Sequence, residues 1–525
     1  MIDTVALREK VLDLAIRGKL VPQDPNDEPA SVLLERIRTQ KQQMVKDGKL
    51  KAKDIKDDSI IFVGEDYLHY EKFADGTVKC IEDEIPFELP EGWSWERLSN
   101  LASFSGGKTP STSKREYWEG NILWVTSKDM KCKYIDSSLL MISEKGLEQM
   151  QLYPENTLLL VTRSGILRHT IPVAILKKPA TINQDLKAIM PYIPNLEEYI
   201  YVCIKGMESR LILEYTKAGA TVENINFDAF QKILLPVPPE NQIQRIITAT
   251  NEADVVIDEL KCDQEDLIDI IGKTKSKILD LAIRGKLVPQ NPDDEPASVL
   301  LERIRAEKEE LIRQGKIKRD KKESVIFKGE DNSYYVRAGE QVEDITVWEL
   351  DDLPESWGIC ALGEICDYGS CTNVETDQIS DDEWILDLED IEKDSGTVLR
   401  KVRKIERNAV STKHKFSEGQ VLYSKLRPYL NKVVLADEDG YCTSEILPLD
   451  FSEIIIPAYA RYYLMSPTFL RYADRCSYGV KMPRLSTTDG KKAVFTVPPI
   501  NEQIRIVETI ETAFTQLDTI AESLN

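Results

Sequence analysis

The stretch LDLAIRGKLVPQ occupies residues 12–23 and occurs again, unchanged, at residues 279–290. Around it, residues 10–38 and 277–305 are identical at 26 of 29 positions, the exceptions being Val11/Ile278, Asp24/Asn291 and Asn26/Asp293. Self-similarity at a fixed offset indicates an architecture built from duplicated units. The sequence is therefore organised as repeat, unlike segment, repeat, unlike segment and tail.

A second pair of similar segments lies where the unlike segments end. LPVPPENQIQRI begins at residue 235 and FTVPPINEQIRI at residue 495, an offset of 260. After the first of them, alternating spacings of three and four residues select Ile243, Ile246, Thr250, Ala253, Ile257, Leu260, Gln264, Leu267, Ile271, Thr274, Ile278 and Leu281. Nine of these twelve residues are apolar, so they form a heptad seam that is buried only against another helix. Between Pro239 and Gly285 we expect one helix, residues 240–284, about 65 Å long.

The two chain ends resemble the two halves of this helix. At an offset of 267, Leu7 and Leu14 correspond to Thr274 and Leu281. At an offset of 260, the C-terminal segment from Ile506 corresponds to the helix's first half. The ends therefore predict a split helix that pairs antiparallel with the continuous one in a closed, pseudo-twofold ring. Residues 1 and 525 should lie within about 25 Å of each other, from the 1.5 Å rise per helical residue.

The predicted fold class is α+β, with two mixed α/β domains joined by long antiparallel coiled-coil helices. The unlike segments contain short apolar runs broken by Gly, Pro, Asn and Asp, which is typical of strands. The predicted domains are an N-terminal repeat, a first unlike segment, a central repeat, a second unlike segment and a C-terminal half-helix, at residues 1–83, 84–237, 238–344, 345–497 and 498–525.

Composition excludes several classes of protein. No apolar run reaches the length of a membrane span, and the N-terminus lacks the apolar core of a signal peptide, so a cytoplasmic location is expected. The net charge of −22 argues against nucleic-acid binding when taken alone. Its distribution is uneven, however, because residues 376–394 are strongly acidic and residues 400–432 hold ten Lys or Arg against two Glu. This excess of +8 predicts a basic surface patch, and a solvated hairpin face is the alternative.

Signatures of catalysis are missing. SFSGGKTPS at 103–111 ends like a phosphate-binding loop, but Ala102 stands where the loop's first glycine is required. GxGxxG, HExxH, GxSxG and the Asn/Asp-Pro-Pro-aromatic motif of amino-methyltransferases are not present. The nine cysteines include no CxxC pair, which favours reduced structural thiols over a zinc site. We therefore expect no catalytic residue, no metal site and no cofactor on this chain.

Loops that mix Lys and Arg with Ser, Thr, Asn, Gln and Tyr recur in both unlike segments. Such side chains supply phosphate contacts and base-edge hydrogen bonds. In the first segment the candidate DNA-binding residues are Lys108, Thr109, Ser111, Ser127, Lys128, Arg163, Ser164, Arg168 and Gln184. In the second they are Lys413, Lys415, Ser424, Lys425, Arg427, Tyr429, Asn431, Lys432, Lys481 and Arg484.

With these motifs in view, the chain closely resembles the specificity subunit of type I restriction–modification systems. The resemblance extends over essentially the whole chain, and GGKTPSTSKREYWEGNILWVTS and GQVLYSKLRPYLNKV carry it most specifically, together with the repeats. It implies that two recognition domains each read half of a split DNA site. It also implies two methyltransferase subunits, which carry S-adenosylmethionine, and restriction subunits driven by ATP with Mg²⁺.

Two other functions stay open at the sequence level. The chain could be a coiled-coil scaffold whose unlike segments bind proteins in another defence complex, although the basic loops argue against it. A self-contained nuclease would show metal-dependent cleavage by the chain alone. A salt-dependent gel shift, with and without a methyltransferase partner, separates the DNA reader from the scaffold.

Overall fold

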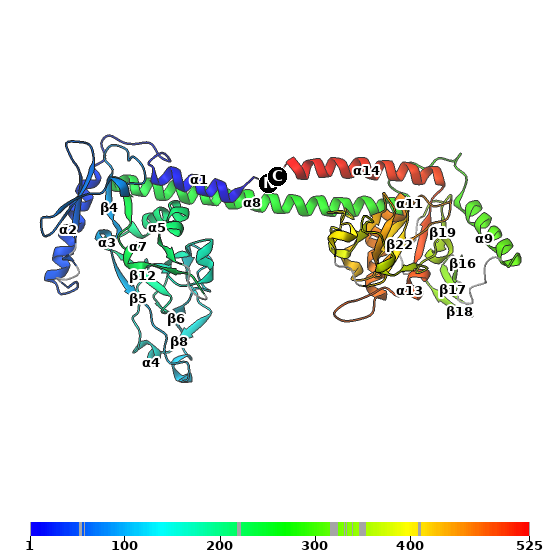
Figure 1. Ribbon diagram of the computed structural model, residues 1–525, viewed down its shortest axis with the longest axis horizontal. Helices are drawn as coiled ribbons and strands as arrows, with labels where there is room; N and C mark the ends of the chain where they lie inside the picture. The colour runs from blue at the N-terminus through cyan, green and yellow to red at the C-terminus, as the bar shows by residue number, and fades with distance from the viewer. Residues whose placement is uncertain are drawn as a thin grey trace. The chain divides into compact units, whose positions relative to one another are not determined.

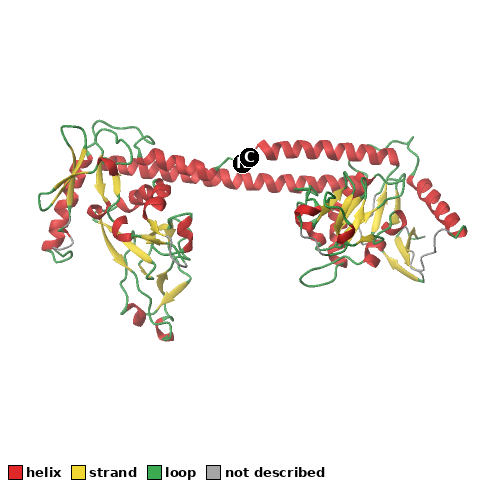
Figure 2. Cartoon of the chain, viewed as in Figure 1, coloured by secondary structure: helices red, strands yellow, loops and turns green. Residues whose placement is uncertain are grey.

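The computed structural model describes residues 2–51, 55–56, 58–217, 222–315, 324–329, 331, 333–338, 340–345, 353–407 and 411–523. The chain divides into two compact units, residues 2–263 and 264–525, called here the first and second unit. Both units mix helices with strands (Figure 2), so the mixed helix-and-strand content predicted from the sequence is confirmed. No described helix is both long enough and apolar enough to cross a lipid bilayer.

The division between the units falls within one long helix, α8, Glu240–Ile283. It begins directly after Pro238 and Pro239, whose rings are compatible only with the first turn of a helix. It ends just before Gly285, whose φ of +66° is a left-handed conformation that glycine adopts without strain. Most of the apolar seam positions in its first half are buried, including Ile246 at 0% exposure.

Each unit packs a terminal helix antiparallel to its own part of α8 (Figure 1). In the first unit, Arg8 of α1 (Thr4–Ile16) pairs with Asp258 at 2.8 Å. In the second unit, Lys275 pairs with Asp518 of α14 (Ile500–Ser523) at 2.5 Å. Arg8 and Lys275 are equivalent at the offset of 267, and Asp258 and Asp518 at the offset of 260, so the same cross-helix ion pair occurs twice. Residues 1 and 525 lie outside the described residues, and their predicted proximity stays a prediction.

One Pro-rich turn follows α1 and another follows α8, and a tryptophan hydrogen bond, called here a polar clasp, lies beside each of them. The Trp93 indole N–H donates to Gln242 Oε1 at 3.0 Å, and the Trp357 indole N–H donates to Glu502 Oε2 at 3.0 Å. Gly18 faces Pro90, whose Cγ would be 2.6 Å from an added Cβ, so this close approach requires glycine. The clasps fix the Pro-rich turns that lead into two equivalent helices, α2 (Ala30–Lys46) and α9 (Ala297–Arg313).

The first unit is built from small sheets around one larger sheet. Its strands are grouped as β1–β2–β3 (Ser59–Val63, His69–Phe73, Val78–Cys80), β15–β4 (Leu234–Val237, Ser94–Arg97), β5–β12–β9–β10–β7 (Ala102–Gly106, Leu186–Pro191, Leu158–Val161, Val173–Leu176, Tyr134–Ile135), β11–β6–β8 (Ala180–Ile182, Ile122–Val125, Leu140–Ile142) and β13–β14 (Thr216–Lys217, Asn224–Ile225). Its further helices are α3 (Leu98–Leu101), α4 (Glu144–Leu147), α5 (Leu196–Gly206), α6 (Glu208–Tyr215) and α7 (Phe227–Phe230).

The second unit has a three-stranded and a two-stranded sheet like β1–β2–β3 and β15–β4 of the first unit, and its other sheets differ from those of the first unit. Its strands are grouped as β16–β17–β18 (Ser324–Lys328, Tyr334–Ala338, Gln341–Asp344), β19–β27 (Gly358–Ala361, Val494–Val497), β20–β22–β25–β21 (Thr372–Val374, Lys413–Phe416, Gly440–Thr443, Ile385–Leu386) and β24–β23–β26 (Val433–Leu435, Val421–Ser424, Ile446–Leu449). Its further helices are α10 (Leu362–Ile365), α11 (Pro457–Met465), α12 (Pro467–Cys476) and α13 (Thr487–Lys492).

One main core in each unit joins its sheets to α8. In the first unit it unites residues of α1, α5 and α8 with the interior strands, and Leu12, Ile200 and Ile246 are all buried in it. Gly206 lets α5 approach α1, because an added Cβ there would lie 2.9 Å from Ile16 Cγ2. The helices α1 and α8 and the sheets of the first unit therefore share one apolar core, which holds the sheets against these helices.

Candidate nucleic-acid interface

Strand register gathers the candidate loops of the first unit at one edge of its large sheet. Lys187 of β12 lies opposite Gly106, the last residue of β5, and Leu186 lies opposite Val161, the last residue of β9. The neighbouring parallel pair β11–β6 ends at the same place, where Asn183 N–H donates to the Val125 carbonyl at 3.0 Å. The loops that follow β5, β6, β9 and β11 therefore emerge side by side.

Hydrogen bonds between these loops hold the candidate side chains together. Lys108 N–H donates to the Ile182 carbonyl at 3.0 Å, and the Trp124 indole N–H donates to the Lys108 carbonyl at 3.2 Å. The Thr109 hydroxyl donates to the Gln184 side-chain oxygen. These contacts position Lys108, Thr109 and Gln184 on one exposed surface, although 75 residues separate Thr109 from Gln184.

The cations at this edge differ in whether they have a partner. Lys108, Lys128 and Arg163 are exposed and form no ion pair within the described residues. Arg168 instead pairs with Glu223, a carboxylate that sequence reasoning missed. Three unpaired cations on neighbouring loops produce a locally positive surface, in spite of the acidic chain as a whole.

The hydroxyl candidates at this edge bond locally. The Ser111 hydroxyl lies 2.9 Å from that of Ser113, and the Ser164 side chain accepts from Ile166 N–H at 3.4 Å. Ser127 is half-buried. The serines shape the loops, whereas the exposed cations and amides are the groups presented to solvent.

In the second unit, two segments far apart in sequence form one surface. Arg427 N–H donates to the Pro483 carbonyl at 2.7 Å, and Leu485 N–H donates to the Lys425 carbonyl at 3.0 Å. This backbone pairing brings the segment 425–432 against the hairpin 478–484. The candidates Lys425, Arg427, Tyr429, Lys481 and Arg484 all come from these two segments.

A strained turn presents Tyr429 at this surface. Arg427 and Asn431, which flank it, both have a φ of +50°, a left-handed conformation that residues other than glycine rarely adopt. The short helical turn Pro428–Leu430 lies between them, and Tyr429 on it is 48% exposed. Backbone strain of this kind persists where surrounding structure imposes it and is concentrated at functional sites.

The predicted basic patch of residues 400–432 is wrong for its first part. Arg407 pairs with Asp390 at 2.6 Å and Arg400 pairs with the same carboxylate at 3.0 Å. Lys413 is buried and lies 3.3 Å from Asp387. The acidic segment before it therefore neutralises these cations, which follow their partners by 10 to 26 residues in the sequence. The positive surface is narrower than the composition indicates.

Other candidates of the second unit are engaged within the protein. Lys432 Nζ donates to the Leu388 carbonyl at 2.6 Å, and burial lowers the pKa of this ammonium. The Ser424 hydroxyl donates to the Leu426 carbonyl at 2.9 Å, and Asn431 Nδ2 donates to the Met465 carbonyl at 3.2 Å. Arg484 pairs with Glu445 at 2.7 Å. These side chains therefore form hydrogen bonds or ion pairs within the protein, because buried polar groups must be paired.

The remaining candidate lysines of the second unit are exposed or partly exposed. Lys415 and Lys481 are exposed and Lys425 is half-buried, and no ion pair joins any of the three to another described residue. Each unit thus presents a small set of unpaired cations beside polar loops. This arrangement is suited to phosphate contacts with base-reading groups between them.

Comparison with known proteins identifies a matching family model and similar chains. Residues 90–250 match the family model of the type I restriction modification DNA specificity domain. The chain is similar to the type I specificity subunits. The specificity subunit of the type I restriction enzyme EcoAI of Escherichia coli is 25% identical, over 96% of this chain and 88% of its own length. That of EcoR124I/EcoR124II, also from Escherichia coli, is 36% identical over 36% of this chain and 46% of its own.

The resemblance predicted from the repeated motifs is confirmed by these matches. Among solved structures, the HsdS subunit from Thermoanaerobacter tengcongensis is 13% identical, over 84% of this chain and 94% of that chain, with a TM-score of 0.40.

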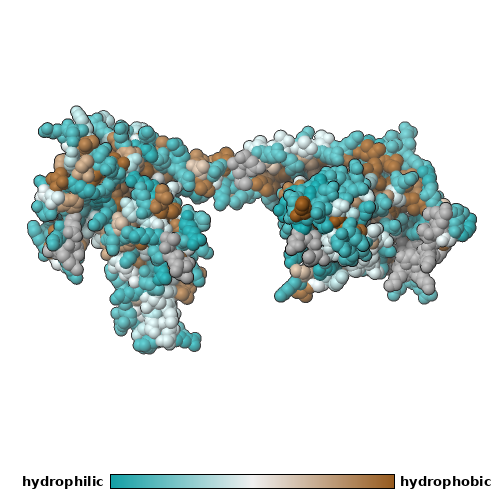
Figure 3. All heavy atoms as spheres, viewed as in Figure 1, coloured by the Kyte–Doolittle hydropathy of each residue, from teal (hydrophilic) through white to brown (hydrophobic). Residues whose placement is uncertain are grey.

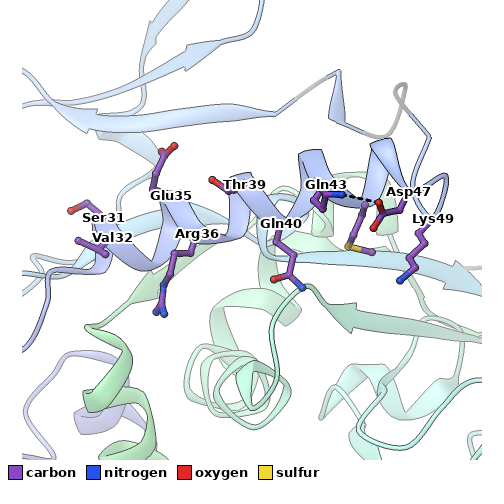
Figure 4. A pocket seen from close by; sticks show the side chains of 10 residues that line it. Ser31, Val32, Glu35, Arg36, Thr39, Gln40, Gln43, Asp47 and Lys49 are labelled. Atoms are coloured by element: carbon purple, nitrogen blue, oxygen red, sulfur yellow. Dashed lines mark hydrogen bonds between the residues drawn. The ribbon is translucent and has the colours of Figure 1, made fainter.

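A hollow on the surface of the first unit lies along α2 (Figure 4). It measures about 850 Å³ and is lined only by residues between Ser31 and Lys49. Arg36 and Gln40 project from the same side of the helix (Figure 4). A small-molecule site needs walls that converge from several segments, whereas this hollow is lined by one segment.

The cysteines and carboxylates offer no reactive centre in the described part of the chain. Three or more His, Cys, Asp or Glu side chains do not converge on a point where they could hold a metal ion, as far as the described ranges extend. Cys360 and Cys366 are buried, and burial raises the pKa of both thiols, which keeps them protonated and unreactive.

Proposed function

We propose that this chain is the DNA-reading subunit of a type I restriction–modification complex, in which each unit reads one half of a bipartite site. The observation that carries the proposal is the specificity-domain match at residues 90–250, whose span contains the loop edge with Lys108, Lys128 and Arg163. The phosphate backbone attracts such unpaired cations, and the polar side chains between them supply base contacts.

The two halves of the site should differ in sequence. The repeats are nearly identical and provide a common frame, whereas residues 84–237 and 345–497 are unlike and carry different polar loops. Side chains that differ in hydrogen-bonding pattern read different base edges. One frame with two different readers therefore recognises two unrelated half-sites.

The antiparallel helices set the distance between the half-sites in this proposal. A helix has a fixed rise of about 1.5 Å per residue, so its length acts as a ruler. A pseudo-twofold reader places its half-site centres about one helical turn of DNA apart. The repeated ion pairs Arg8–Asp258 and Lys275–Asp518 support this rigid frame.

The proposal assigns chemistry to partner subunits. Methyltransferase subunits would bind S-adenosylmethionine and methylate adenine, and restriction subunits would use ATP and Mg²⁺. The repeated helices α2 and α9 support docking of two copies of one partner. Val32 and Val299 are equivalent, identical and 39% and 43% exposed, so packing within the chain does not explain why both positions keep an apolar residue.

Methylation mapping tests the proposed function. The chain is co-expressed with its methyltransferase subunits in a host free of other modification enzymes, and methylated adenines are mapped across the genome. A bipartite motif with an unread gap of constant length is the expected result. A single contiguous motif would refute the two-reader proposal. Assembly without any DNA binding in a gel shift would favour the scaffold.

A further inference from the structure

A narrow hairpin in the second unit holds apolar side chains in solvent. Tyr478 and Arg484 close it with two backbone hydrogen bonds, of 3.1 and 3.0 Å, and Gly479 turns the chain with a φ of +101°. Between them, Val480 is 102% exposed and Met482 is 51% exposed. The loop that precedes α13 projects from the body of the unit in Figure 1, and Figure 3 shows that the visible surface around it is mostly hydrophilic.

The hairpin is anchored at its base, so the tip cannot withdraw into the core. The Arg484 guanidinium donates to both Glu445 carboxylate oxygens, at 3.0 and 2.7 Å. Arg427 N–H and the Pro483 carbonyl add a further bond of 2.7 Å. Burial of Val and Met side chains is favourable, and in this conformation the free protein does not gain it. The side chains of Val480 and Met482 are therefore available to contact the apolar interior of a partner.

The charges around the tip indicate what kind of partner it fits. Lys481 lies at the tip between Val480 and Met482 and is exposed, and Lys425 lies at the hairpin's base. A duplex combines an anionic exterior with apolar base faces in its interior. The tip also continues directly into the segment 425–432 that belongs to the candidate DNA surface. A DNA duplex therefore matches both the apolar tip and its cationic surroundings.

We propose that Val480 and Met482 insert as a wedge between neighbouring base pairs of the half-site read by the second unit. This inference rests on the proposed function and deepens it. Apolar side chains that enter a base step unstack it and kink the duplex, at a cost of a few kcal/mol that new contacts offset. Chemistry on an adenine requires the base to leave the stack, so local unstacking would lower the cost of its exposure.

The test uses the complete complex with its methyltransferase subunits and a duplex that carries the mapped site. Each adenine in and beside the second half-site, except the adenine that methylation mapping identifies as the modified base, is replaced in turn by 2-aminopurine, whose fluorescence rises on unstacking. We expect the wild-type complex to raise fluorescence at one step, and V480S/M482S to abolish the rise. Affinity should fall by less than about tenfold, because the lost contacts and the saved unstacking cost offset each other.

Two control variants separate wedging from charge and from general apolar exposure. L399S/I405S removes two other exposed apolar side chains of the same unit, Leu399 at 60% and Ile405 at 74% exposure, and should leave the fluorescence rise intact. Lys481→Ala should flatten the salt dependence of binding and keep the rise.

Each outcome of this experiment has a defined meaning. Two outcomes would overturn the wedge and leave the proposed function unaffected. One is a fluorescence rise that persists in V480S/M482S. The other is a wild-type complex that binds the site without raising fluorescence at any position. A wild-type complex that neither binds DNA nor methylates a bipartite site overturns the proposed function itself.

Discussion

The unpaired cations at the loop edge of the first unit yield a quantitative prediction. Replacing Lys108, Lys128 and Arg163 with alanine removes three exposed positive charges that have no ion-pair partner among the described residues. Each lost phosphate contact flattens the slope of log K against log salt by about 0.9, so the triple variant should flatten it by about 2.7. Between 50 and 200 mM salt, the wild-type complex should therefore lose about 40-fold more affinity than the variant.

The assay is fluorescence anisotropy of the assembled complex on a duplex with the mapped site, at four or more salt concentrations. Lys178→Ala is the control, because Lys178 is exposed and follows β10, which runs away from the loop edge. A second duplex without the site should show the same change in slope, since phosphate contacts carry no sequence information.

Two results would refute the reasoning behind this prediction. The first is a slope that the triple variant leaves within about 0.5 of the wild-type slope, although each lost phosphate contact is worth about 0.9. The second is an equal flattening by Lys178→Ala, which would mean that the charge of the whole chain matters and not this edge. Circular dichroism and assembly with the methyltransferase subunits verify that the variant is folded.

Two further predictions concern the clasps and the second reader. Trp357→Phe removes a donor from the buried Glu502 carboxylate and should cost about 1.5–3 kcal/mol of unfolding free energy, whereas Trp93→Phe removes one from a neutral amide and should cost about 1 kcal/mol. Burial raises the pKa of Glu502. As the pH falls through that pKa, the carboxyl is protonated, and the unfolding free energy lost in Trp357→Phe should shrink, whereas the loss in Trp93→Phe should stay constant. Hydrogen exchange in urea measures both, and equal, pH-independent losses would contradict the assignment. Exchange of residues 345–497 for another recognition domain should change one half-site in methylation maps, and a change in both would contradict independent reading.

Much of the local structure was predictable from the sequence. The heptad seam, Pro239 and Gly285 predict a helix over 240–284, and the structure places α8 at Glu240–Ile283. Periodicity and backbone restriction act over neighbouring residues, so they can be read directly from the sequence. The mixed helix-and-strand content and the resemblance to specificity subunits rest on equally local motifs.

The state of each candidate side chain was not predictable in the same way. Lys413 and Lys415 stand two residues apart on β22, and residues at this spacing face the same side of a sheet, yet Lys413 is buried beside Asp387 and Lys415 is exposed. Strand periodicity therefore does not distinguish the two lysines. Residues 479–484, GVKMPR, contain the candidates Lys481 and Arg484, whereas the apolar residues at the tip of this hairpin were not among the predicted site residues. An apolar residue between Gly and Pro in a polar loop was the available signal.

By itself, therefore, the sequence determined the elements of this protein, its duplicated frame and its family resemblance, because each depends on periodicity, turn chemistry or motif. Only the tertiary structure decided which cations are free and which are neutralised. Arg168 pairs with Glu223 across 55 residues and Arg484 with Glu445 across 39, and the same fold leaves Lys108 unpaired. Ion pairing depends on distance and burial, and strand register sets both between residues that are remote in the chain.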